Sequence, residues 1–517
     1  MREHDEPPLF RPGAGAPTGA PPLTWTAGRH DDMGNPEAET NGSDLAFAPV
    51  RQRSAELRLL VPALVAGASG LVAASLALTG EVDPSVTLAI VVVSACAVAL
   101  HVLMRFLAPY ADPVLLPVAT VLNALGLTMI WALQMAKAEP GHGDADRQLL
   151  WTVAGTVLCG ATIVLVRRPR RLTMYTYVIA VAALLLLLLP LSPLGIEVLG
   201  ARRWIGIGPF TMQPSEFAKV LLVIFLASYL GRQRTVMSLV THTVKVGRVK
   251  VFSVPRARDL APMAVGWGMA ILLLVGTRDL GTSLLLFGTF LAVLYAATGR
   301  KSWVAIGLIA FSAGAYVAYL LFGHVRNRVE IWLNAFDPEV YGRPGGSFQV
   351  VEGMFALANG GVLGTGFHEG FAQEVFAADS DLVLVSVGEK LGLTGLMAVL
   401  VLLFLLAERG FRIALACRDV FLKLTALGYA FLLAFNVFIV LGGATLVIPL
   451  TGMTTPFLSA GGSALMANWV IIGLWLVISE HARRPQATFS EGLAPGDAST
   501  EIIDVRRVPR RPRRDEG

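Results

Sequence analysis

The feature that most constrains this chain is a series of apolar segments, each about as long as a lipid bilayer is thick. A helix needs roughly 20 apolar residues to cross the hydrocarbon core, and the 517-residue sequence contains about twelve such segments. Only 15% of the residues are charged, whereas about a quarter are charged in a soluble domain. The sequence therefore predicts an all-α, polytopic integral membrane protein with about 12 transmembrane helices.

These expected spans define three regions of the chain. We place a transmembrane domain at residues 53–482, between tails at 1–52 and 483–517 whose Pro, Gly and charged residues predict disorder. The expected spans are, in chain order, 57–79, 86–107, 113–135, 148–166, 173–194, 214–231, 260–277, 280–298, 303–322, 382–407, 420–445 and 463–481.

The basic residues between the spans predict how the chain crosses the membrane. With a cytoplasmic N-terminus, nearly every dense basic cluster falls on the cytoplasmic side, including the run at 167–171, as the positive-inside rule requires. Arg202 and Arg203 are the exception. Both termini are then cytoplasmic, and a large loop at 323–381 is extracytoplasmic. The net charge of +5 lies in these short loops and tails, which indicates membrane topology and not nucleic-acid binding.

The first of four unusual polar segments is GARRWIGIGPFTMQPSEFAK, residues 200–219. Pro214 suits the first turn of a helix. Glu216 and Lys219 are spaced i, i+3, so they share a helix face and can pair. Such a pair near a bilayer is costly without a role, although a purely structural ion pair is an equal alternative.

Further cations stand near the expected outer face. In TRDLGTS (277–283), Arg278 could contact a phosphate in a bidentate manner, and the favoured role of Asp279 is to cap the following helix. In HVRNRVEIWLNAFDPE (324–339), Arg326 and Arg328 are further candidates.

The third and fourth segments combine glycines with acidic and polar residues. GGVLGTGF (360–367) predicts a tight turn or a close approach to a ligand. In AADSDLVLVSVGEKLG (377–392), Ser380 and Asp381 come at a helix start, with Glu389 two turns further on. An isolated loop carboxylate is more often solvated or capping than catalytic.

The fourth segment is IPLTGMTTPFLSAGGSALMANW (448–469), which breaks the helical pattern at the membrane edge. It must therefore be buried in protein or line a cavity.

Taken together, these motifs resemble the SEDS family (shape, elongation, division and sporulation). QPSEFAK, RDLGT, the GGVLGTGF loop followed by DSDLVLVSVGEKLG, and TTPFLSAGGS occur in the family's order, over roughly residues 110–482. The resemblance implies about ten core spans, so two spans here would be N-terminal additions. The motifs look closer to the RodA (elongation) branch than to the FtsW (division) branch.

The resemblance implies a peptidoglycan glycosyltransferase that polymerises lipid II at the outer face of the cytoplasmic membrane, with a class B penicillin-binding protein as partner. It implies that Asp381 is the catalytic carboxylate. The sequence offers a set of polar residues as substrate-binding candidates, and a divalent cation is a further candidate for the diphosphate. The candidates are Glu216, Lys219, Arg202, Arg203, Arg278, Arg326, Arg328, Gln349, Ser380 and Glu389.

Departures from the family pattern and two rival functions accompany this hypothesis. Asp379 and Ser380 replace the usual His and Thr, and Arg278 replaces a Pro, which puts substrate handling near Asp379 in question. Membrane-embedded charges also suit a flippase for lipid-linked precursors. A non-catalytic scaffold that recruits a synthase is the other alternative.

Overall fold

The computed structural model describes residues 53–137, 144–198, 201–208, 210–239, 242–246, 249–254, 268 and 279–484. Within this part, eleven helical segments are long and apolar enough to cross a membrane. They are α1 (Arg53–Thr79), α2 (Pro84–Leu107), α3 (Leu115–Ala136), α4 (Asp144–Leu165), a segment at Pro169–Leu191 built on α5 (Thr176–Leu188), α6 (Pro214–Leu239), α8 (Leu280–Thr298), α9 (Lys301–Leu321), α13 (Val383–Ala416), α14 (Val420–Ala444) and α15 (Gly462–Arg483).

These helices confirm the predicted fold class of a polytopic membrane protein. Eleven of the twelve expected spans appear, most with ends within a few residues of the prediction. The expected span at 260–277 lies outside the described residues, as do both tails beyond 53–484. α13 extends to Ala416 although the prediction ended at 407, because the charged turn at 408–412 continues as helix.

Short strands are an addition that the helical prediction did not include. β1 (Gly195–Val198), β2 (Ala201–Ile207) and β3 (Phe210–Met212) form an antiparallel sheet in that order. A separate pair joins β4 (His242–Val246) to β5 (Val249–Val254). The pairing of β1 with β2 is irregular between Ile196 and Glu197, whose partners are Trp204 and Arg202, so Arg203 is an extra residue on β2.

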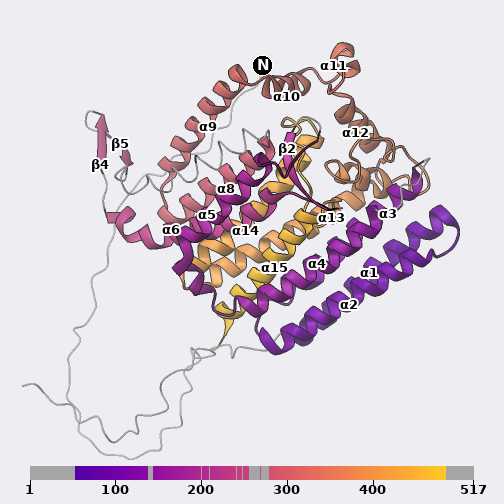
Figure 1. Cartoon of the computed structure of the whole chain (residues 1–517), viewed down its shortest axis with the longest axis horizontal. Coiled ribbons are helices and arrows are strands. Elements are labelled where there is room, and N and C mark those ends of the chain that lie inside the picture. Colours follow the sequence, from indigo (N-terminus) through magenta and orange to yellow (C-terminus); the bar gives the residue numbers. More distant parts are fainter. Residues whose placement is uncertain are drawn as a thin grey trace, which may run out of the picture. The chain divides into compact units, whose positions relative to one another are not determined.

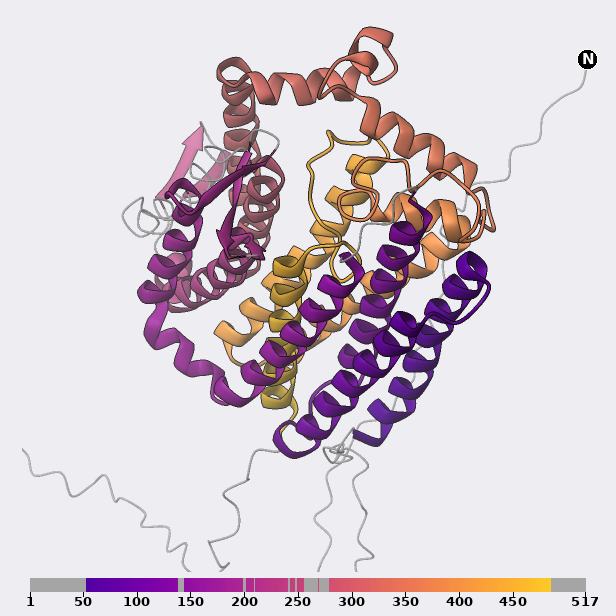
Figure 2. The same cartoon turned by 45° about the vertical axis from the view of Figure 1, so that its right-hand side comes forward.

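The large expected loop at 323–381 is in fact partly helical. It contains α10 (Gly323–Leu333), α11 (Pro338–Gly342) and α12 (Phe348–Asn359). Figure 2 shows these helices crossing one end of the bundle, between α9 and the start of α13. The large loop between the spans therefore includes short helices, and α12 carries an apolar face that buries Val350, Val351 and Ala356.

At the edge of the bundle, α1 and α2 lie side by side against α3 and α4 (Figure 1). α4 also packs along α15, and α13 packs along α14. The main hydrophobic core lies between α3, α6, α13, α14 and α15. The two N-terminal helices keep many exposed apolar side chains, as expected for helices that face lipid.

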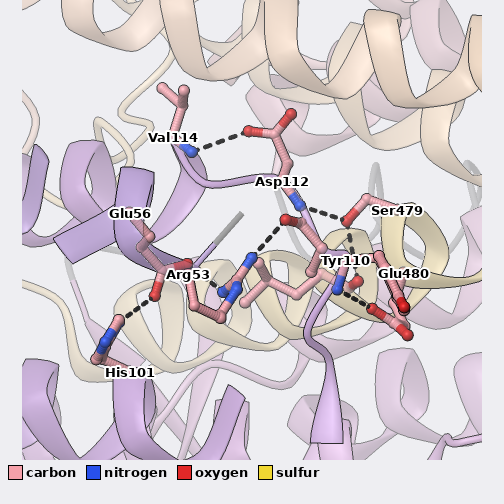
Figure 3. A network of polar contacts seen from close by, with 10 residues as sticks. Arg53, Glu56, His101, Tyr110, Asp112, Val114, Ser479 and Glu480 are labelled. Carbon is pink, nitrogen blue, oxygen red and sulfur yellow. Dashed lines mark hydrogen bonds and ion pairs between the residues drawn. The ribbon is translucent and has the colours of Figure 1, made fainter. Parts of the chain in front are cut away.

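A buried polar network joins this N-terminal hairpin to the core (Figure 3). Arg53 donates to the Glu56 carboxylate and to the Ala111 carbonyl, and His101 Nδ1 lies 2.7 Å from Glu56 Oε1. All three side chains are less than 10% exposed. Buried charges require such partners, so the network fixes how α1 and α2 meet the segment that leads into α3.

We expect Glu56→Ala to destabilise the protein, since the buried Arg53 guanidinium would lose its carboxylate. Breaking a buried ion pair from one side typically costs about 3–5 kcal/mol. Thermal unfolding of the detergent-purified protein would measure this loss. Glu81→Ala is the matched control, because Glu81 is exposed in the turn between α1 and α2. Equal melting temperatures for the two variants would contradict the role given to Glu56.

Candidate functional site

Asp381 lies in a turn two residues before α13 begins at Val383. The backbone just before it is held by a distant segment. Ala460 N donates to the Asp379 carbonyl at 2.7 Å, and Ser459 Oγ donates to the Ser380 carbonyl at 2.5 Å. The irregular segment before α15 therefore fixes the position from which the Asp381 side chain projects.

That irregular segment is itself tied together and buried. Ser459 Oγ accepts from Thr455 N at 2.7 Å, and Gln148 Nε2 donates to the Ser459 carbonyl at 3.2 Å. Gly461 N donates to Gln148 Oε1 at 3.3 Å. Thr455 and Ser459 are almost fully buried. Of the two alternatives that the sequence left open for the segment at 448–469, burial in protein or the lining of a cavity, these contacts support burial around residues 455–461, where α4 supplies the amide that satisfies the backbone.

Two arginines from different elements approach the Asp381 carboxylate. Gly452 has a φ of +67°, and a Cβ placed there would lie 3.2 Å from Asp381 Oδ2 and 3.8 Å from Arg203 Nη1. Both groups therefore border the same small space. Asp381 and Arg203 form no ion pair within 4.0 Å, and Arg203 Nε is buried without a hydrogen-bond partner among the described residues. The two groups are near one another but leave hydrogen-bonding capacity unused.

The second arginine is Arg328 of α10. Its Nη1 donates to the Leu450 carbonyl, and Trp332 Nε1 of the same helix donates to the Leu446 carbonyl at 2.8 Å. α10 is therefore anchored to the segment that follows α14. This anchoring brings a cation from the region after α9 to the edge of the Asp381 site.

Burial raises the pKa of the Asp381 carboxyl above its usual range, and this is the largest influence on it. The positive charges of Arg203 and Arg328 lower the pKa in part, and the carboxylates of Asp379 and Asp279 raise it. Burial also lowers the pKa of Arg328, with the repulsion of Arg203 acting in the same direction. A carboxylate with a raised pKa is a stronger base than a solvated one.

A second polar layer lies beneath this site at the starts of α6 and α8. Asp279 caps α8 by accepting from Thr282 N at 3.3 Å, as expected, and Ser215 Oγ lies 3.5 Å from Asp279 Oδ2. Pro214 opens α6, which confirms its predicted place in the first turn. Gln213 Nε2 donates to Ser215 Oγ at 3.1 Å. These contacts lock two helix starts beside Asp381.

Glu216 and Lys219 form the predicted i, i+3 ion pair at 2.8 Å. Their side chains are only 8% and 6% exposed. The buried ion pair is thus confirmed, and its role in substrate binding stays a prediction.

Arg202, Arg326 and Gln349 form no hydrogen bond or ion pair with Asp381 in the described part of the chain. Arg202 is half exposed and lies 3.6 Å from Glu197. Arg326 is exposed, stands over the Tyr319 ring and donates to the Leu320 carbonyl. Gln349 lies on α12, where its Nε2 is buried with no hydrogen-bond partner in the described part of the chain. Arg278 lies outside the described residues.

Glu389 has a clear structural environment within α13. It is fully buried and accepts hydrogen bonds from Asn359 Nδ2 at 3.0 Å, Phe371 N at 2.9 Å and Ala372 N at 2.6 Å. Its carboxylate therefore holds the segment at 370–372 against α13. This arrangement points to a positioning role rather than to contact with a substrate.

The glycine-rich turn packs against the same stretch of α13. Gly392 has a φ of +70° within α13, and its missing Cβ would lie 2.3 Å from Gly364 N. Thr365 N donates to the Glu389 carbonyl at 2.9 Å. The tight-turn interpretation of GGVLGTGF is confirmed, and the close approach is to the protein's own backbone.

Sequence reasoning missed three contributors to this site, namely Gly452, Ser459 and Gln148. Gly452 and Ser459 stood inside a segment singled out for its irregular backbone, but nothing local tells which carbonyls they would meet. Gln148 is the first residue of the expected span at 148–166. A buried amide in an apolar helix could have been flagged, because polar side chains there usually satisfy a neighbouring element.

The positively charged groups that act on Asp381 are arginines. Among the described residues, no three His, Cys, Asp or Glu side chains lie close enough together to hold a metal ion. The described part of the chain thus offers no dedicated ligand set for the divalent cation that the sequence analysis considered, and Arg203 and Arg328 are the cations placed at the carboxylate.

The fold and this geometry define a polytopic integral membrane protein with a partly buried carboxylate between two arginines at one end of its helix bundle. Residues 112–484 match the family described as cell cycle proteins, which comprises FtsW, RodA and SpoVE. The match covers well over half of the chain, and the chain belongs to this family. α1 and α2 precede the matched region, in agreement with the prediction of two additional N-terminal spans.

Relatives with curated names support this assignment. The peptidoglycan glycosyltransferase RodA of Mycobacterium tuberculosis (strain H37Rv) is 43% identical over 78% of this chain and 86% of its own length. The probable peptidoglycan glycosyltransferase FtsW of Geobacter metallireducens is 31% identical over 71% of this chain and 94% of its own. The higher identity to the relative named RodA agrees with the predicted branch.

Two solved structures share the fold. A chain from a structure described as the structural coordination of polymerization and crosslinking by a peptidoglycan synthase complex has a TM-score of 0.57 and 28% identity, over 72% of this chain and 99% of its own. The Rod shape determining protein RodA of Thermus thermophilus has a TM-score of 0.51 and 26% identity, over 74% of this chain and all of its own.

Replacing Glu389 with Ala should destabilise the protein rather than impair the site selectively, because buried backbone N–H groups would lose their acceptor. Each such loss costs roughly 1–3 kcal/mol. Thermal unfolding and limited proteolysis near residue 371 would detect the change. Glu374→Ala serves as the control, since Glu374 is exposed in the same segment. A Glu389→Ala protein as stable as the control would refute the positioning role.

Proposed function

We propose that this protein is a peptidoglycan glycosyltransferase that polymerises lipid II, with Asp381 as its catalytic base. The observation that carries the proposal is the Asp381 carboxyl, which is partly buried and lies beside Arg203 and near Arg328 without a direct ion pair. The names of its relatives support the class of reaction.

The reaction requires a base and a means of stabilising negative charge. A sugar 4-hydroxyl attacks the anomeric carbon of the donor, the new glycosidic C–O bond forms, and the bond from that carbon to the diphosphate breaks. Asp381 accepts the hydroxyl proton, and the leaving lipid diphosphate keeps the electron pair. A single displacement inverts the anomeric carbon, by analogy with inverting glycosidases.

Arg203 and Arg328 are the proposed partners of the diphosphate. Guanidinium groups bind phosphate oxygens strongly and in a bidentate manner, and the unused Nε of Arg203 provides a donor for this purpose. Ser380, Glu216 and Lys219 remain proposed contributors to substrate binding. Gln349, with a buried and unpaired amide nitrogen, is a proposed polar contact on the α12 side.

The partner and topology complete the proposal. We propose a class B penicillin-binding protein as the transpeptidase partner, which the solved complex that couples polymerization with crosslinking supports. The Asp381 end of the bundle faces outward, and both termini are cytoplasmic. Residues 53–482 form the membrane domain between the tails at 1–52 and 483–517.

Asp381→Asn should reduce polymer formation by at least about 100-fold, since general-base catalysis typically contributes 10²–10⁴ in rate. The measurement is glycan polymerisation from lipid II by the purified protein with its cognate transpeptidase. Asp379→Asn is the matched control, because Asp379 is neighbouring but lies toward Lys137 at 3.9 Å. Full activity of folded Asp381→Asn would reject the assignment. No polymer from the wild-type complex would favour a flippase or scaffold.

The pH dependence gives a second test. The base acts only when deprotonated, so polymerisation is lost as the pH falls through the pKa of Asp381, which lies above its usual range. Arg203→Gln removes a cation that lowers this pKa, so the acid limb should move to higher pH. Arg202→Gln should leave it in place, because the exposed Arg202 lies 3.6 Å from Glu197 and is not among the charges that act on the pKa of Asp381. Equal shifts, or none, would argue against the proposed electrostatics.

A further inference from the structure

A cavity of about 650 Å³ lies at the end of the bundle opposite Asp381. α15 begins near the Asp381 site and ends beside this cavity, after 22 residues, or roughly 30 Å of helix. The cavity is bordered by the ends of α2, α4 and α15 and by the turn at Pro169–Tyr175. Its volume is within the range of small-molecule sites, about 300–1,000 Å³.

One wall of the cavity is strongly basic. Five arginines line it: Arg167, Arg168, Arg170, Arg171 and Arg484. Arg170 pairs with Asp419 at 3.0 Å, and Arg484 lies 3.9 Å from Glu480. Arg167, Arg168 and Arg171 form no ion pair within the described part of the chain. The cavity therefore has an excess of positive charge after its carboxylates are counted.

The nearby carboxylate of Glu480 is already engaged by the protein. Tyr110 N donates to Glu480 Oε2 at 2.6 Å, and Asp112 N donates to Ser479 Oγ at 3.1 Å (Figure 3). Arg483 Nη2 donates to Asp112 Oδ2 at 2.6 Å. These contacts hold the α2–α3 connection against the end of α15, so this side of the cavity is structurally fixed. The Glu480 carboxylate is already bound by a backbone N–H and does not compete for the unpaired arginines of the cavity.

The other wall of the cavity is apolar. Phe106, Ile163 and Val477 belong to it, and Phe106 is 76% exposed at the end of α2. An exposed apolar ring at the end of a membrane-spanning helix can contact lipid acyl chains near the headgroups. A soluble anion would use only the basic wall, whereas a lipid would use both.

We propose that this cavity binds the headgroup of an anionic phospholipid, with its phosphodiester on Arg167 and Arg171 and its upper acyl chain against Phe106 and Ile163. Guanidinium groups match phosphate oxygens in a bidentate manner, and basic pockets between membrane helices favour anionic headgroups. The site is separate from Asp381 and independent of the proposed glycosyltransferase activity. It would anchor the added N-terminal hairpin to the lipid at the end of α15.

The test is titration of the full-length protein, purified in neutral detergent, with phosphatidylglycerol and with phosphatidylcholine, using native mass spectrometry to count bound lipids. The test variant is Arg167→Gln with Arg171→Gln. The matched control is Arg58→Gln with Arg105→Gln, which removes the same charge from exposed positions that do not line the cavity. The basic C-terminal tail contributes equally to all three proteins.

We expect the wild type and the control to retain one tightly bound phosphatidylglycerol, and the test variant to bind it at least about tenfold more weakly, since each arginine at a membrane surface contributes about fivefold. Phosphatidylcholine should not be retained, and millimolar inorganic phosphate should not displace the lipid. Unchanged affinity in the test variant, an equal loss in the control, retention of phosphatidylcholine, or displacement by inorganic phosphate would each overturn the proposal.

Discussion

The contact on which the site depends is the clamp between the segment before α15 and the turn before α13. At membrane depth, irregular backbone is stable only where protein satisfies its polar groups. Here Ser459 and Ala460 donate hydrogen bonds to the carbonyls of Ser380 and Asp379. Gln148 in turn donates to the Ser459 carbonyl. The protein can therefore leave the regular helix at the point where the Asp381 carboxylate projects, without exposing unpaired backbone to lipid.

The clamp also explains the electrostatics of Asp381. A buried carboxylate in direct contact with an arginine would be neutralised and a weaker base. Asp381 is instead near Arg203 and within the field of Arg328, while Gly452 keeps the space between the groups free of a side chain. The cost of burial is thus partly offset, and the cations keep donors available for an incoming anion.

The two ends of the helix bundle carry different candidate sites. One end carries the carboxylate site, built from β2, α10, α13 and the segment before α15. The other carries the arginine-lined cavity and the network that docks α1 and α2. α15 connects both, so a rigid helix sets the distance between the proposed catalytic and lipid sites. The N-terminal hairpin, which lies outside the family match, contacts the second end through Arg53 and the α2–α3 connection.

The sequence alone determined the membrane class, eleven spans of the described part and the family, because apolar length and short motifs are local properties of the chain. It also predicted the Glu216–Lys219 pair and the Asp279 cap, whose partners are close in sequence, and its motifs singled out Asp381 as a candidate. Tertiary structure alone decided which arginines face the carboxylate. Arg203 and Arg202 are adjacent and chemically equal, but Arg202 lies 3.6 Å from Glu197 whereas Arg203, at an irregularity in the β1–β2 pairing, borders the Asp381 carboxylate. Arg328 reaches the site through a contact 122 residues away. Glu389 likewise has its role set by backbone N–H groups that only folding brings to it.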